Sequence, residues 1–305
     1  MEMHTNRRQF LKTLAAGSIA AAIPFPVEGT SSSRNTLTIL HTNDVHSHLE
    51  PFDRNHPTFP KMGGFARRAS IIKKLRKQKE HVLLLDAGDI FQGTPYFNFF
   101  GGKPELELMS KMQYDAATIG NHEFDNGMQH LAEQLQYADF PFICSNYNFE
   151  GTIMEGKPLP WKIIEKGPFR IGIIGLGINP AGLVSPVNYE GMEWLNPVKI
   201  GEETASFLKN EKNCNLIIAL SHLGIDSTSE RPDSDQKVAA ETSSIDIIIG
   251  GHSHTFLDEP QQIKNKEGKT VIINQVGWGG VILGQLDIVL NKGKTTFLAA
   301  QHLIR

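Results

Sequence analysis

Apolar residues follow two patterns along this chain. Short, nearly continuous apolar runs are typical of strands buried on both faces, whereas apolar residues that recur every three or four positions are typical of helices. The runs predict strands at 36–42, 81–85, 115–119, 140–144, 161–165, 170–176, 216–220, 245–249, 271–274, 281–290 and 295–301. The helical spacing predicts helices at 63–79, 104–112, 128–138 and 198–209. Because strands and helices alternate, the sequence predicts an α/β fold with helices or a second sheet packed on each face of a buried sheet.

Two finer expectations concern the second half of the chain. The inward face of the predicted helix 198–209 should be formed by Ile200, Thr204, Phe207 and Leu208. The last three strands, from residue 271 onward, should follow one another as a meander.

Five predicted strands are followed at once by residues that can bind metal ions. These residues are Asp44, His46, Asp89, Asn121, His222, His252 and His254. In open α/β sheets the C-terminal ends of parallel strands share one edge, where ligands bind. If the five strands are parallel neighbours, the side chains therefore converge. Residues two apart on an extended chain point the same way, so Asp44 would pair with His46 and His252 with His254.

The types of donor narrow the kind of ion. Carboxylates, an amide and imidazoles without a thiolate suit Mn, Zn, Fe or Co better than Ca or Mg. Two carboxylates buried together would be costly to desolvate, and a pair of divalent ions removes that cost, with Asp89 as the simplest bridge. Two ions about 3.5–4 Å apart share a water, lower its pKa and stabilise the attacking and leaving oxygens. Hydrolysis of a phosphate ester is the reaction class that needs this arrangement most.

Composition excludes several other classes of protein. The 30 Lys and Arg residues against 33 Asp and Glu residues give a net charge of −3, which excludes a broad basic face for duplex nucleic acid. The two cysteines exclude a disulfide scaffold and a CxxC zinc site. No apolar run reaches about 18 residues, so no ordinary transmembrane span is expected.

The polar motifs resemble those of the calcineurin-like metallophosphoesterases. They are Asp44-x-His46, Gly88-Asp89, Gly120-Asn121-His122-Glu123, His222 and Gly251-His252-x-His254. Longer strings resemble the 5′-nucleotidase and UDP-sugar hydrolase branch, namely His41–His46, Lys61–Arg67, Gly120–Asp125, Gly250–His254 and Gly277–Leu286. The resemblance implies a four-layer αββα sandwich of two mixed β-sheets flanked by helices. An amidohydrolase, which His46-x-His48 would also fit, has no place for the motifs around Asn121 and His252.

The resemblance also implies a site for two divalent metal ions. The first ion would be held by Asp44, His46, Asp89 and His254, and the second by Asp89, Asn121, His222 and His252. His122 and Asp125 would form the catalytic pair. The implied reaction is attack of a metal-bridging hydroxide on a phosphate ester, with nucleotide 5′-monophosphates or related phosphomonoesters as substrates. A phosphodiesterase acting on cyclic nucleotides or sugar nucleotides is the alternative.

The first thirty residues are predicted to be an export signal. Arg7-Arg8 precedes Phe10-Leu11-Lys12 and a short apolar stretch, a pattern that resembles a twin-arginine signal. We therefore expect a signal at 1–30, a linker at 31–35 and a catalytic domain at 36–305 of a periplasmic protein, tethered to the membrane if the signal is not cleaved. No counterpart of the family's C-terminal nucleotide-specificity domain is visible in the sequence, so a separate substrate-binding chain is a further expectation.

Overall fold

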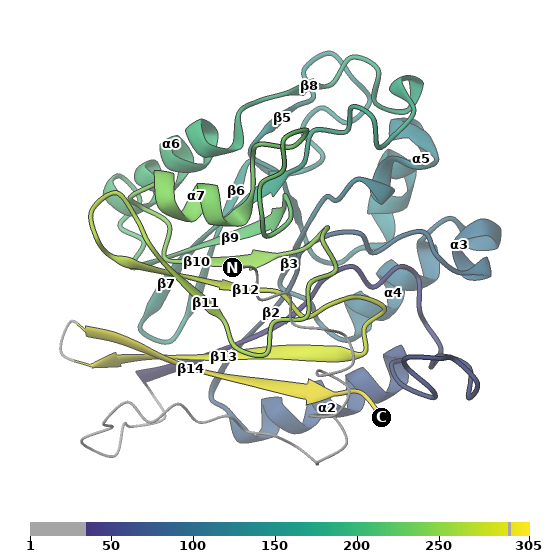
Figure 1. The fold of residues 1–305 in the computed structure, drawn as a ribbon, viewed down its shortest axis with the longest axis horizontal. Helices are drawn as coiled ribbons and strands as arrows, with labels where there is room; N and C mark the ends of the chain where they lie inside the picture. Colours follow the sequence, from purple (N-terminus) through teal and green to yellow (C-terminus); the bar gives the residue numbers. More distant parts are fainter. Residues whose placement is uncertain (1–34, 292–293) are drawn as a thin grey trace.

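Two six-stranded mixed β-sheets face each other in the computed structural model, which describes residues 35–291 and 294–305 (Figure 1). The first sheet has the order β14-β13-β1-β2-β3-β4, and the second has the order β11-β12-β10-β9-β7-β6. The first consists of β1 (Thr36–Thr42), β2 (His81–Asp86), β3 (Ala116–Thr118), β4 (Phe142–Ile143), β13 (Ile282–Asn291) and β14 (Lys294–Leu303). The second consists of β6 (Trp161–Lys166), β7 (Phe169–Gly177), β9 (Leu216–His222), β10 (Ile247–Gly250), β11 (Gln261–Lys264) and β12 (Thr270–Asn274). A small separate sheet pairs β5 (Tyr147–Asn148) with β8 (Glu193–Trp194).

Helices cover the outer face of each large sheet. Those on the first sheet include α2 (Phe65–Gln78), α4 (Lys103–Lys111) and α5 (Gly127–Gln134), whose apolar side chains share a core with that sheet. The second sheet carries α6 (Pro197–Asn210) and α7 (Asp235–Glu241). The inner faces of the two sheets bury a further core between them, to which Ile39, Leu83, Ile218 and Ile249 contribute. The predicted αββα sandwich is therefore confirmed.

Strand β2 shows why the continuous apolar runs predicted buried strands. Successive residues of a strand point to opposite faces. Leu83 and Leu85 lie in the core between the sheets, whereas Leu84 lies in the core under the helices of the first sheet. Parallel pairing with β1 on one side and β3 on the other leaves no open edge. Both faces of the strand are apolar because both are covered.

Of the predicted inward face of α6 only Leu208 is buried, and the other predicted positions were wrong. The buried residues of the helix are Pro197, Gly201, Ala205 and Leu208. Phe207 is 36% exposed, and its ring packs against that of Trp161 at 5.8 Å between centroids. The small residues Gly201 and Ala205 let the helix approach the sheet closely, and large side chains flank the contact. A hydrophobicity pattern favours large residues, so it missed this stripe.

The predicted C-terminal meander was also wrong. Strand β12 lies in the second sheet and pairs parallel with β10, whereas β13 and β14 form a hairpin in the first sheet beside β1. The chain therefore crosses from one sheet to the other between residues 275 and 281. Apolar periodicity identifies a strand but carries no information about its partner, because pairing depends on contacts distant in sequence.

His41 on β1 is a fully buried histidine whose Nε2 accepts a hydrogen bond of 2.8 Å from Asn274. Burial lowers its pKa from 6.5 to about 3. Below pH 6.5 the unfolded chain binds a proton that the folded protein excludes, so stability present above that pH is lost progressively on acidification. We expect the free energy of unfolding to lose about 2 kcal/mol more between pH 6.5 and pH 5 in the natural protein than in His41→Gln. Urea unfolding at both pH values checks this, and parallel pH dependence of the two proteins would contradict it.

Two observations concern the chain ends and membranes. The predicted export signal at 1–30 and nearly all of the predicted linker lie outside the described residues. Within residues 35–291 and 294–305, no helix has the length and apolar character needed to cross a membrane.

Candidate metal centre

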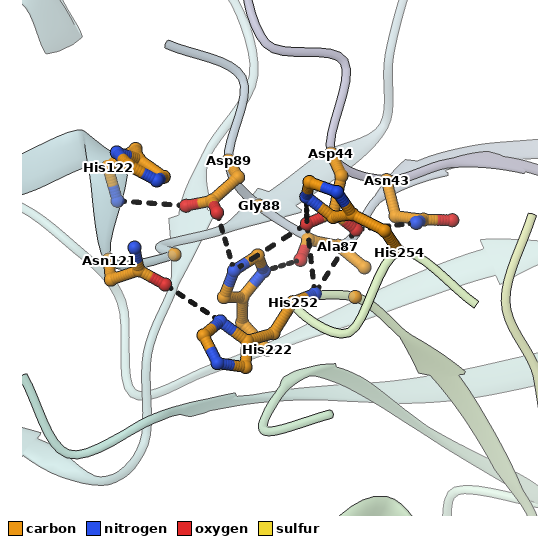
Figure 2. A network of polar contacts seen from close by, with 12 residues as sticks. Asn43, Asp44, Ala87, Gly88, Asp89, Asn121, His122, His222, His252 and His254 are labelled. Atoms are coloured by element: carbon orange, nitrogen blue, oxygen red, sulfur yellow. Dashed lines mark hydrogen bonds and ion pairs between the residues drawn. The ribbon is translucent and has the colours of Figure 1, made fainter. Parts of the chain in front are cut away.

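The seven predicted metal-binding side chains converge in one cluster, and Figure 2 shows all of them except His46. Figure 2 shows Asp44, Asp89 and His222 meeting at the centre of the cluster. The condition posed for this convergence, that the five preceding strands are parallel neighbours, holds only within each sheet. Strands β1, β2 and β3 belong to the first sheet, and β9 and β10 to the second. The site therefore lies where the ends of both sheets meet.

The backbone around the candidate ligands differs from the extended chain that the spacing argument assumed. Five of the seven have a positive φ, namely Asp44 (48°), His46 (49°), Asp89 (54°), His252 (71°) and His254 (52°). This left-handed conformation is unfavourable for residues other than glycine, and such strain concentrates at functional sites. The side chains thus converge because each loop turns sharply after its strand, and the surrounding contacts must stabilise those turns.

One group of donors consists of Asp44, His46 and His254, whose candidate ligand atoms all lie within 4.8 Å of one another. Nε2 of His46 is 2.9 Å from Nε2 of His254, which is 3.4 Å from Oδ1 of Asp44. Nδ1 of His46 can donate to the carbonyl of Phe91 at 3.3 Å, which leaves its Nε2 free to bind an ion. The side chains of this group therefore face a common point.

A second group consists of Asp89, His222 and His252, whose candidate ligand atoms also lie within 4.8 Å of one another. Nε2 of His222 lies 3.0 Å from Oδ2 of Asp89, and Nδ1 of His252 lies 2.9 Å from Oδ1 of Asn121. Nδ1 of His222 donates to the carbonyl of Ala87 at 2.7 Å, which points Nε2 at the site. Asp89 connects the two groups, because its Oδ2 is also 3.9 Å from Nε2 of His46.

These residues fit a pair of divalent ions on three grounds. Asp44 is fully buried and Asp89 is 2% exposed, and two carboxylates buried together need compensating positive charge. Nε2 of His222 is buried and makes no well-directed hydrogen bond, and it faces Oδ2 of Asp89 at 3.0 Å. Two imidazole Nε2 atoms face each other at 2.9 Å in His46 and His254, an arrangement that a shared cation explains.

Protonation in the metal-free protein supports the same interpretation. Burial alone would lower the pKa of His222, but the charge of Asp89 raises it to about 10. A proton on His222 thus occupies the place that a cation would take, and metal binding would release it. Burial lowers the pKa of His252 to about 4, which keeps its ring neutral and able to bind an ion.

His122 and Asp125 lie beside the cluster and contact each other. Nδ1 of His122 donates to Oδ2 of Asp125 at 2.7 Å, and both side chains are partly exposed. Burial would lower the pKa of His122, but the hydrogen bond to Asp125 and the charge of Asp89 raise it to about 8 in the metal-free protein. A partly exposed cationic ring beside the cluster can contact an anionic substrate or give a proton to it.

Two residues that stabilise the site were missed by the sequence analysis. Nδ2 of Asn43 donates to Asp44 Oδ2 and to the carbonyl of Gly277, both at 2.6 Å. Nε2 of Gln275 donates to the carbonyl of Gly251, and its Oε1 accepts from the backbone of Thr255. Asn43 lies inside a recognised motif and could have been noticed. Gln275 had no local signal, because its contacts form only once β12 lies beside β10 in the second sheet.

Fold and site together define a metallophosphoesterase, and comparison with known proteins agrees. The calcineurin-like phosphoesterase family matches residues 37–256. This chain belongs to that family.

Among its relatives is the snake venom 5′-nucleotidase of Crotalus adamanteus, which is 37% identical over 276 residues, covering 84% of this chain and 45% of the relative. The crystal structure of a 5′-nucleotidase precursor from Thermus thermophilus superimposes with a TM-score of 0.77 at 33% identity, covering 88% of this chain and 54% of that one. The structure of the NAD nucleotidase of Haemophilus influenzae superimposes with a TM-score of 0.77 at 27% identity. The match covers 88% of this chain and 50% of that one. The chain thus spans about half the length of these relatives.

Proposed function

We propose that this protein is a hydrolase of phosphate esters that uses two divalent metal ions. The observation that carries the proposal is the meeting of two donor groups at Asp89, with the partly exposed His122 and Asp125 beside them. Asp44, His46, Asp89 and His254 would hold one ion, and Asp89, Asn121, His222 and His252 the other. Such a pair supplies a water of lowered pKa and neutralises charge on the phosphoryl group.

The catalytic pair contributes proton transfer and orientation in this proposal. His122, as a cation, contacts the phosphoryl group and protonates the leaving oxygen. Asp125 accepts the Nδ1 proton of His122 in a hydrogen bond and so directs Nε2 toward the substrate. This division of roles agrees with a distance of 2.7 Å between the two side chains.

Nucleotide 5′-monophosphates are the proposed substrates, because the Crotalus and Thermus relatives are named 5′-nucleotidases. A phosphodiesterase or pyrophosphatase acting on larger nucleotides is the second candidate, since the Haemophilus relative is named for NAD. We propose Mn, Zn, Fe or Co as the ions from the mixed oxygen and nitrogen donors. A separate chain that binds the rest of the substrate stays a prediction, since the structure describes one chain.

We also propose that residues 36–305 form one catalytic domain that is exported to the periplasm by the twin-arginine route. The shared core between the two sheets supports a single domain. The basic and apolar pattern of residues 1–30 supports export.

A direct assay tests the proposed function. Purified protein is treated with a chelator, reloaded with Mn²⁺, and given p-nitrophenyl phosphate, its bis-ester and AMP. We expect no hydrolysis before reloading and, afterwards, faster hydrolysis of the two monoesters than of the bis-ester. Faster hydrolysis of the bis-ester would favour the phosphodiesterase. Binding of two Mn²⁺ ions without hydrolysis of any of the three would overturn the proposal for the isolated protein and favour a catalytic subunit that needs a second chain.

A further inference from the structure

Glu123 is a fully buried carboxylate beside the metal centre that takes no part in the proposed ligand set. It lies in the short helix η2 (His122–Phe124), which directly follows Asn121. Its two oxygens accept hydrogen bonds from four backbone N–H groups. On Oε1 these are Ile90 at 2.8 Å and Phe91 at 3.2 Å, and on Oε2 Asp89 at 2.9 Å and Gly120 at 2.6 Å. One carboxylate therefore holds the loops after β2 and β3 together.

The loop after β2 needs such a contact. Asp89 has a φ of 54°, and a strained residue persists only where its surroundings hold it. The successive N–H groups of residues 89–91 point at one carboxylate, the kind of concavity in which backbone amides bind an anion. Without Glu123, the three N–H groups of this loop and that of Gly120 would lose their acceptor, at a considerable energetic cost.

The two loops also contact each other directly. The backbone N–H of His122 donates to Oδ1 of Asp89 at 2.9 Å. A Cβ atom added to Gly120 would lie 2.2 Å from the same Oδ1, so only glycine allows this approach. The separation between Asp89 and Asn121 is therefore set within the loops. Glu123 bonds to both loops, at the backbone of residues 89–91 and at that of Gly120.

We propose that Glu123 is a positioning residue that fixes Asp89 relative to Asn121 at the spacing a pair of metal ions requires. This inference rests on the proposed function, because it assigns a role within the same site. Glu123 is not proposed as a ligand or as a proton donor, since its oxygens are occupied by four amides and a carboxylate offers about four acceptor positions. Residues that orient metal ligands typically change metal affinity when they are replaced.

The test variant is Glu123→Gln, which keeps the size of the side chain. The amide has one oxygen instead of two and turns an NH₂ group toward two N–H donors. We expect Mn²⁺ to bind about 10–100-fold more weakly. We also expect the exchange-coupled electron paramagnetic resonance signal of a two-manganese centre to be reduced. Isothermal titration of chelated protein with Mn²⁺ and the resonance spectrum of the reloaded protein measure these effects.

Glu202→Gln is the matched control. Glu202 also accepts two backbone N–H bonds, from Ser243 and Ser244, but in a loop that contributes no candidate ligand. We expect this variant to keep the natural Mn²⁺ affinity and spectrum. If Glu123→Gln does not fold, Glu123→Asp replaces it, because the shorter carboxylate cannot reach all four amides and should show the same loss in smaller degree.

The outcomes separate this inference from the proposed function. Failure of the natural protein to bind two Mn²⁺ ions would overturn both. Two ions bound by the natural protein and by the folded Glu123 variant, with dissociation constants within twofold and the same spectrum, would overturn the positioning role alone. If Glu123 had a purely structural role, Mn²⁺ affinity and the spectrum would be unchanged, and only the unfolding temperature of the metal-free variant would fall.

Discussion

Asp89→Asn is expected to lower kcat about a thousandfold or more and to leave fewer than two Mn²⁺ ions bound. Asp89 lies 3.0 Å from Nε2 of His222 and 3.9 Å from Nε2 of His46, so it contacts both donor groups. The amide removes the charge that would hold the ions together, and metal ions stabilise the transition state by several kcal/mol. Steady-state kinetics with p-nitrophenyl phosphate and metal analysis of the gel-filtered protein measure the two effects.

Asp246→Asn is the control for this variant. The carboxylate of Asp246 accepts a backbone bond from Ile217 at 2.8 Å and contacts Lys209, and none of these residues belongs to the donor groups. It should leave kcat and metal content unchanged. Retention of two ions with kcat within tenfold of the natural value in Asp89→Asn would contradict the bridging role.

His122→Ala is expected to retain both metal ions and to lose about 10²–10⁴ in kcat, the usual contribution of a general acid or base. The partly exposed ring lies beside the cluster, with Nδ1 held by Asp125 at 2.7 Å. Its ring is also close to Asp89 and His46, and the three residues together form a third candidate donor group. Metal analysis therefore separates the two roles, because removal of a ligand lowers metal content whereas removal of a proton donor does not.

His81→Ala is the matched control, since His81 begins β2 at the end opposite to Asp89. His81→Ala should change neither the metal content nor kcat. Loss of a metal ion in His122→Ala with activity largely preserved would show that His122 is a ligand, and the catalytic assignment would then be wrong.

Local patterns anticipated most elements but not their arrangement. The run Val82–Leu85 identified a strand with two buried faces, and both are buried. The partners of β12 and β13 were not predictable, because pairing depends on residues far apart in sequence. The close face of α6 was missed because Gly201 and Ala205 are small, and a hydrophobic pattern gives weight to large side chains.

In the candidate site, too, the residues were predictable from local patterns and their arrangement was not. Residues such as Asp44 and His254 were identified because a polar group directly after an apolar strand is conspicuous in one dimension. The geometric reason offered for pairing Asp44 with His46, and His252 with His254, was wrong. The loops turn through left-handed conformations and are not extended. Glu123 was visible in a motif, but its four backbone contacts exist only once β2 and β3 lie side by side.

The sequence by itself determined which chemical groups are present and where each strand ends, because apolar periodicity and residue type are local properties. It therefore determined the α/β class and the set of carboxylate, amide and imidazole donors. Only the tertiary structure decided that these donors come from two sheets, that Asp89 contacts both groups, and that Glu123 holds the loops of Asp89 and Asn121 together. The physical reason is that backbone amides and buried charges find their partners across the fold, where distance along the chain carries no information.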